Sequence, residues 1–127
     1  MVSSNSMVPA DLEKSEVMKM LAEELIKAGN IARGIDVARQ ALEIQSNFFH
    51  GMVNANVQET MLLLAEALTI DSQIDEAIKL YTEVLNARSA GGEPTKDIYR
   101  AIAPLYTQNG NFTQAAVCLA KVLEKEE

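Results

Sequence analysis

The amino-acid sequence predicts an all-α protein in which three antiparallel helix hairpins form a stack. Apolar residues recur at three- and four-residue steps along most of the chain, and glycine-containing turns interrupt this spacing. The same pattern of apolar and small residues also recurs around each of three turns. With 127 residues, 48% of them hydrophobic, the chain suits one domain with a single core.

The first hairpin is expected over about residues 9–50. Gly29 can take the positive φ that ends a helix, and Asn30 stands where the N-cap of the next helix should. Residues 1–8 are expected to form a disordered N-terminal tail. The apolar residues on helical spacing are Leu12, Val17, Met18, Leu21, Ala22, Leu25 and Ile26 before the turn, and Ile31, Ile35, Ala38, Ala41 and Leu42 after it.

The second and third hairpins are expected over about residues 53–88 and 94–127. The second turn, Ser72–Asp75, has the spacing of a capping box, in which a serine caps the helix and an acidic residue caps it in return. In the third turn, Gly110–Asn111 repeats the glycine and asparagine of the first. Residues 9–127 are therefore expected to form one helical domain.

The three hairpins share one frame when their turns are superimposed. Their second helices begin at Ile31, Ile74 and Phe112, which lie 43 and 38 residues apart. Small residues occupy all six positions where paired helices should cross most closely, because a larger side chain there would overpack the crossing by about 1–3 kcal/mol. Glycine inside a helix costs about 1 kcal/mol in propensity, so Gly34 predicts an especially close approach. The six small residues are Ala22, Gly34, Ala65, Ala77, Ala103 and Ala115.

This arrangement resembles the tetratricopeptide repeat (TPR) family. The resemblance covers about residues 15–127 and rests on the six small residues, the turns, and Leu21, Leu64 and Ile102 in the first helices. The repeat spacing exceeds the usual 34 residues, so the chain is more similar to the longer repeats of kinesin light chains. The resemblance implies a right-handed superhelix whose first helices line a concave face that binds peptides or partner helices. Its expected function is a non-enzymatic protein-interaction scaffold or adaptor.

The frame places five acidic and two basic residues on the groove face of the first helices. Glu23 and Glu66 would repel a carboxylate, so a basic or amphipathic segment is the expected partner, with apolar contact from Ile26 and Leu62. The alternative interpretation is a charged groove that is merely solvated. The candidate partner-binding residues are Lys19, Glu23, Ile26, Leu62, Glu66, Thr69, Arg100 and Thr107, and the same face also carries Glu16, Glu59, Asp97 and Pro104.

Composition argues against several other functions. The net charge is −7 and no basic residue occurs between Arg39 and Lys79, so neither nucleic acid nor an anionic membrane is expected as a partner. His50 and Cys118 are single, which leaves no Cys/His set for zinc, and no cofactor is expected. Adjacent carboxylates diverge on a helix and cannot share a reacting atom, so no catalytic residue is assigned.

A single cysteine and a start without a basic flank or apolar run indicate a reducing compartment and a cytoplasmic location. No apolar stretch approaches the roughly 20 residues that cross a bilayer.

Two apolar features leave alternatives open. Phe48, Phe49 and Met52 lie in the connection after the first hairpin and are either inter-hairpin core, which is favoured, or an exposed anchor. The last helix carries Val117 beside its inward residues, as an uncapped end of a repeat stack would. A further repeat, a partner or a second copy could cover it. Self-association, including a homodimer within a larger assembly, is therefore the alternative function.

Overall fold

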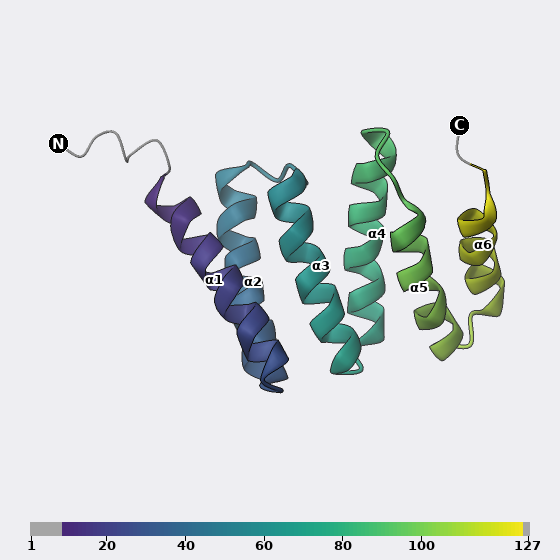
Figure 1. Ribbon diagram of the computed structural model, residues 1–127, viewed down its shortest axis with the longest axis horizontal. Helices are drawn as coiled ribbons and strands as arrows, with labels where there is room; N and C mark the ends of the chain where they lie inside the picture. Colours follow the sequence, from purple (N-terminus) through teal and green to yellow (C-terminus); the bar gives the residue numbers. More distant parts are fainter. Residues whose placement is uncertain (1–8, 126–127) are drawn as a thin grey trace.

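The computed structural model describes residues 9–125, which form a stack of six α-helices (Figure 1). Consecutive helices pair as three antiparallel hairpins, and the first and last helices stand at opposite ends of the stack. The all-α stack expected from the sequence is confirmed, whereas the tail expected over residues 1–8 lies outside the described residues. The helices are α1 (Ala10–Lys27), α2 (Ile31–Phe48), α3 (Ala55–Ile70), α4 (Ile74–Ala90), α5 (Lys96–Gln108) and α6 (Phe112–Leu123).

Each hairpin turn contains a residue with positive φ. Gly29 (φ 87°) and Gly110 (φ 74°) take this conformation as expected, and Ser72 (φ 64°) takes it in the second hairpin. The expected capping box at Ser72 is therefore wrong, since a serine N-cap requires extended backbone and Ser72 instead ends the turn after α3. The N-cap position falls on Gln73, whose side chain makes no capping hydrogen bond.

The asparagines expected as N-caps occupy those positions without capping the helices. Asn30 and Asn111 precede α2 and α6, but their side chains make no hydrogen bond to the first turn. Asn54 caps α3 instead, since its side-chain oxygen accepts a 3.0 Å hydrogen bond from the Val57 amide. The backbone of these turns, rather than their capping side chains, therefore defines where α2 and α6 begin.

The six small residues expected at the helix crossings are all buried. At Gly34 the approach is so close that an added Cβ would lie 2.7 Å from Cγ1 of Ile26 and 3.4 Å from the carbonyl oxygen of Ala22. The glycine in α2 is thus explained by α1, which leaves no room for a side chain.

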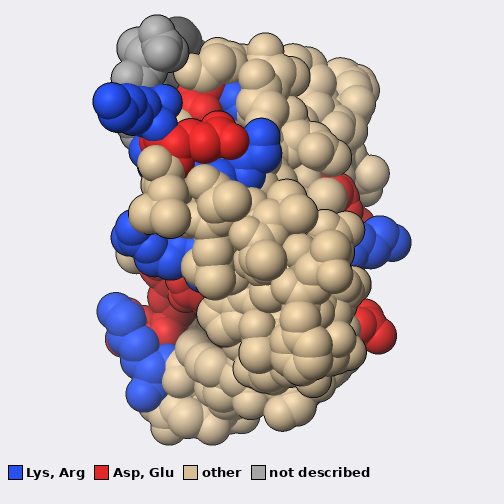
Figure 2. Space-filling view, turned by 90° about the vertical axis from the view of Figure 1, so that its right-hand side faces the viewer, with Lys and Arg blue, Asp and Glu red and all other residues tan. Residues whose placement is uncertain are grey.

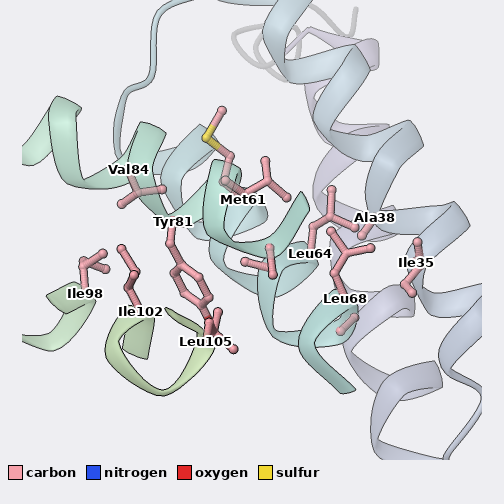
Figure 3. Close-up of a cluster of buried hydrophobic side chains, with 14 of the residues drawn as sticks. Ile35, Ala38, Met61, Leu64, Leu68, Tyr81, Val84, Ile98, Ile102 and Leu105 are labelled. Carbon is pink, nitrogen blue, oxygen red and sulfur yellow. The ribbon is translucent and has the colours of Figure 1, made fainter. Parts of the chain in front are cut away.

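One hydrophobic core runs through the stack between neighbouring hairpins (Figure 3). Leu64 and Leu68 of α3 lie toward Ala38 of α2, while Tyr81 of α4 lies toward Ile102 of α5. All five are at most 6% exposed. The second helices α2 and α4 are therefore each covered by the first helix of the next hairpin, as in repeat proteins whose units contact their neighbours.

Polar contacts on the surface also join neighbouring hairpins. The guanidinium of Arg39 on α2 donates two hydrogen bonds to the carboxylate of Glu76 on α4. The hydrogen bond from Arg39 lowers the pKa of the Glu76 carboxyl. The amide of Asn109 donates a 2.8 Å hydrogen bond to Asp75. Exposed pairs of this kind contribute about 0–1 kcal/mol, so they help to orient the hairpins more than they stabilise them.

The connection between the first two hairpins is more exposed than the favoured interpretation held. Met52 is 66% exposed and Phe48 is 37% exposed, whereas Phe49 packs against the core. The rings of Phe48 and Phe49 meet edge to face with centroids 4.9 Å apart. Only Phe49 of these three therefore joins the core, because Phe48 and Phe49 point in different directions at the end of α2 and Met52 lies beyond the helix.

Gly34→Ala is expected to lower the free energy of unfolding by up to about 2 kcal/mol, because overpacking of about 1–3 kcal/mol exceeds the helix-propensity gain of about 1 kcal/mol. Ile26→Ala removes the nearest obstructing atom. In that background Gly34→Ala is expected to be neutral or stabilising by up to about 1 kcal/mol.

Urea denaturation of the wild type, the two single variants and the double variant measures this coupling. An equal effect of Gly34→Ala in both backgrounds would show that Ile26 is not what excludes a side chain at position 34.

Candidate interaction groove

Two hollows adjoin along α3 and together form what we call the groove. The α1–α3 hollow has a volume of about 260 Å³, and the larger α3–α5 hollow about 630 Å³. They share Glu59 and Leu62, so the groove is continuous over α3. The α1–α3 hollow is also lined by Lys19, Glu23, Leu63 and Glu66, and the α3–α5 hollow by Ala55, Gln58, Arg88, Glu93, Pro94, Lys96 and Asp97.

The structure brings four of the eight sequence-predicted residues together in the α1–α3 hollow. They are Lys19 and Glu23 on α1, and Leu62 and Glu66 on α3. Their helical spacing places them there, since residues three and four apart share one face of a helix. Leu62 and Glu66 therefore project from α3 into the same hollow that Lys19 and Glu23 reach from α1.

The other four predicted residues line neither hollow. The partly buried Ile26 side chain packs against Gly34 inside the first hairpin, away from the lining of both hollows. The half-buried Thr69 donates its hydroxyl to the Ala65 carbonyl at 2.8 Å, which holds it against its own helix. Arg100 and Thr107 are exposed on α5 beyond the hollows.

The positive charge of Lys19 is offset by carboxylates inside the α1–α3 hollow. Its Nζ lies 2.5 Å from Oε1 of Glu59 and 3.7 Å from Oε1 of Glu16. Burial lowers the pKa of Lys19, but the hydrogen bond to Glu59 and the charges of Glu16, Glu59 and Glu23 outweigh it, so the pKa is raised. The amine therefore stays charged and already has its carboxylate partners.

The remaining carboxylates give the α1–α3 hollow a negative charge. Glu23 and Glu66 are exposed and make no ion pair within residues 9–125. Leu62 and Leu63 line the same hollow and are half-buried. An acidic rim beside an aliphatic floor can bind a cationic side chain and an apolar side chain of the same ligand.

The α3–α5 hollow is organised by Arg88, which the sequence analysis missed. Its guanidinium donates to both carboxylate oxygens of Asp97 at 3.0 Å, to Oε1 of Gln58 at 3.2 Å and to the Pro94 carbonyl at 3.3 Å. The repeat frame assigned groove positions to first helices, whereas Arg88 comes from α4. A usable signal was present, since Arg88 in the last turn of one helix and Asp97 in the first turn of the next flank a short connection.

Residues 9–125 contain no group of three or more His, Cys, Asp or Glu side chains that could hold a metal ion. Among the same residues, no helix has both the length and the apolar character needed to span a bilayer.

Comparison with known proteins defines the class of fold. No protein-family model matches the chain, and its sequence matches no curated protein. The TPR-like repeats of a candidate kinesin light chain from Podospora anserina match over 92% of this chain and 56% of theirs, with a TM-score of 0.77 and 21% identity. A point variant of that protein matches with the same TM-score and identity. The protein BtubC (BKLC) from P. vanneervenii matches over 85% of this chain and 44% of its own, with a TM-score of 0.76 and 18% identity.

The chain therefore has the fold of a TPR-like α-solenoid. Within that class, the Podospora structures that it resembles are TPR-like repeats of a candidate kinesin light chain, in agreement with the resemblance drawn from the long repeat spacing. The chain spans just over half the length of the Podospora structure.

Arg88→Ala is expected to lower the free energy of unfolding by about 1–2 kcal/mol. Hydrogen bonds to charged groups contribute about 1.5–3 kcal/mol, and the exposure of Asp97 reduces that value here. Arg88→Lys is expected to restore only part of the loss, because an ammonium cannot reproduce the guanidinium fork. Urea denaturation measures all three proteins.

Arg33→Ala is the matched control, since Arg33 is exposed on α2 and makes no ion pair among residues 9–125. Its expected effect is within about 0.5 kcal/mol. Equal losses at Arg88 and Arg33 would show that the Arg88 contacts do not stabilise the α4–α5 connection.

Proposed function

We propose that this protein is a non-enzymatic scaffold that binds a basic or amphipathic segment of a partner protein in its groove. The observation that carries the proposal is the charge of the α1–α3 hollow. Lys19 is paired with Glu59, whereas the carboxylates of Glu23 and Glu66, which line the same hollow as Leu62, make no ion pair among residues 9–125.

The fold supports the general part of this proposal. TPR-like repeats are typically non-catalytic protein-interaction scaffolds, and the Podospora structure that matches this chain consists of such repeats. A groove lined by helices accepts an amphipathic helix through apolar anchors spaced along one face. In the proposed complex Leu62 and Leu63 would contact those anchors, while Glu23 and Glu66 would select lysine or arginine beside them.

The proposal also covers the setting in which binding occurs. The acidic composition, with a net charge of −7, supports a protein partner over nucleic acid or an anionic membrane. A cytoplasmic location is proposed from the single cysteine, Cys118, which is buried in α6.

A pair of synthetic peptides tests the groove directly. One carries Lys and Leu on the same face at helical spacing, and the other has Glu in place of each Lys. Fluorescence anisotropy is expected to show tighter binding of the Lys peptide, and Glu66→Lys is expected to weaken that binding about tenfold, equivalent to about 1.4 kcal/mol. A Lys peptide with Ser in place of Leu is expected to bind less tightly than the Lys and Leu peptide.

Glu43→Lys on α2 is the matched control, because it makes the same charge change at another exposed glutamate, outside both hollows. Its expected effect on peptide binding is less than twofold. If Glu43→Lys and Glu66→Lys weaken binding equally, the attraction comes from net charge and the groove proposal fails. Affinity purification with wild-type bait and with a folded Leu62→Arg, Glu66→Arg bait then identifies natural partners that require the groove.

Self-association is the second candidate function, and the exposed apolar side chains of α6 favour it.

A further inference from the structure

The outer face of α6 carries a stripe of exposed apolar side chains. Phe112 is 67% exposed, Leu119 is 52% exposed and Leu123 is 84% exposed, with the exposed Ala116 between them. Steps of four, three and four residues place these side chains on one face of the helix. The space-filling view of this end of the stack shows a broad surface with few charged side chains (Figure 2).

The repeat frame shows what the same positions do in the other hairpins. Leu119 corresponds to Ala38 of α2 and Tyr81 of α4, which are 0% and 6% exposed. These positions pack against the first helix of the following hairpin, α3 or α5. The complete stripes are Ile31, Ile35, Ala38 and Leu42 on α2, and Ile74, Ile78, Tyr81 and Leu85 on α4. The stripe on α6 is therefore the stacking surface of a hairpin that no further hairpin covers within residues 9–125.

The complementary surface lies at the other end of the stack, on α1 (Figure 1). Val17 is 59% exposed and Leu21 is 43% exposed. Leu21 corresponds to Leu64 of α3 and Ile102 of α5, which are 2% and 1% exposed because they pack on the preceding hairpin. Val17 likewise corresponds to the buried positions 60 and 98. α1 thus exposes the face with which α3 and α5 pack against the preceding hairpin.

The charges at the two ends are also complementary. Between adjacent hairpins, Lys19 on α1 pairs with Glu59 on α3. In the repeat frame Arg100 on α5 takes the position of Lys19, and Glu16 on α1 takes that of Glu59. Arg100 makes no ion pair within residues 9–125. If the α6 end of one copy met the α1 end of another in the same register, Arg100 would face Glu16 of the second copy.

From these correspondences we propose that the occupant of the α6 stripe is α1 of a second copy of this chain. The copies stack head to tail, and the contact repeats the α2–α3 and α4–α5 contacts across two chains. Such an interface is heterologous and leaves a free α6 and a free α1 at the ends, so association is open-ended. The groove along the first helices would continue from one copy into the next.

Glu24 sets a limit on the strength of this contact. It occupies the position of Ala67 and Leu105, which are 0% and 2% exposed. A carboxylate there must lose part of its hydration when copies stack, which costs free energy. The association is therefore expected to depend strongly on protein concentration, and Glu24→Leu is expected to tighten it about tenfold.

Sedimentation velocity of the full 127-residue chain over a concentration series tests the proposal. The weight-average mass of the wild type is expected to rise beyond that of a dimer. Leu119→Glu blocks the α6 end and Val17→Glu blocks the α1 end, so each variant alone is expected to remain monomeric. An equimolar mixture of the two is expected to form a one-to-one dimer and nothing larger, because each supplies the end that the other lacks.

Three outcomes would overturn the proposal. A wild type that stays monomeric at all concentrations contradicts the proposal. A Val17→Glu variant that still dimerises also contradicts it, because that result assigns the stripe to a two-fold α6–α6 contact. Failure of Glu24→Leu to tighten association would show that α1 is not the occupant. Circular dichroism and thermal unfolding at low concentration check that the variants are folded.

The stacking proposal can fail independently of the groove proposal. Leu119 and Val17 line neither hollow, so Leu119→Glu is expected to leave binding of the Lys and Leu peptide unchanged. A variant that no longer self-associates but still binds the peptide would therefore show that the ends of the stack, and not the groove, mediate self-association.

Discussion

The close approach of the two helices in each hairpin is the constraint on which the rest of the structure depends. Gly34 lies so near Ile26 and Ala22 that α1 and α2 have no space for large side chains where they cross. The alanines at the crossings of the other hairpins are buried in the same way. Larger apolar side chains such as Leu64 and Tyr81 therefore form the core between hairpins. A hairpin of this kind depends on its neighbours for its stability.

The groove follows from the same arrangement, because stacked hairpins bring their first helices side by side. Lys19 and Glu59 then face one another from α1 and α3, and their pairing removes the positive charge on which a carboxylate ligand would depend. Arg88 consolidates the other side of α3 by holding Gln58, Pro94 and Asp97. The ionic contacts thus determine both the sign of the surface charge and how α4 leads into α5.

Much of this architecture could be predicted from the sequence, because helical spacing and the small crossing residues are local or periodic signals. The features that could not be predicted depend on tertiary contacts between helices. Ile26 lies at the border of two helix faces, and its side chain fills the space that Gly34 leaves. Arg88 reaches the groove from a second helix, which the frame did not treat as groove-lining. Ser72 adopts the positive φ that glycine takes in the other hairpins, and a serine does not indicate this conformation in the sequence.

The exposed ends of the stack have a consequence for folding and local unfolding. Contacts between helices join mainly neighbours in the sequence, so its folding requires few long chain closures and is expected to be fast. The hairpin of α3 and α4 is flanked on both sides by another hairpin, whereas the outer two are flanked on one side within residues 9–125. Local unfolding is therefore expected to cost the least free energy at the ends, and backbone amides in α3 and α4 are expected to exchange their hydrogens most slowly. Protection against exchange would rise at α6 and α1 together if a second copy covered them.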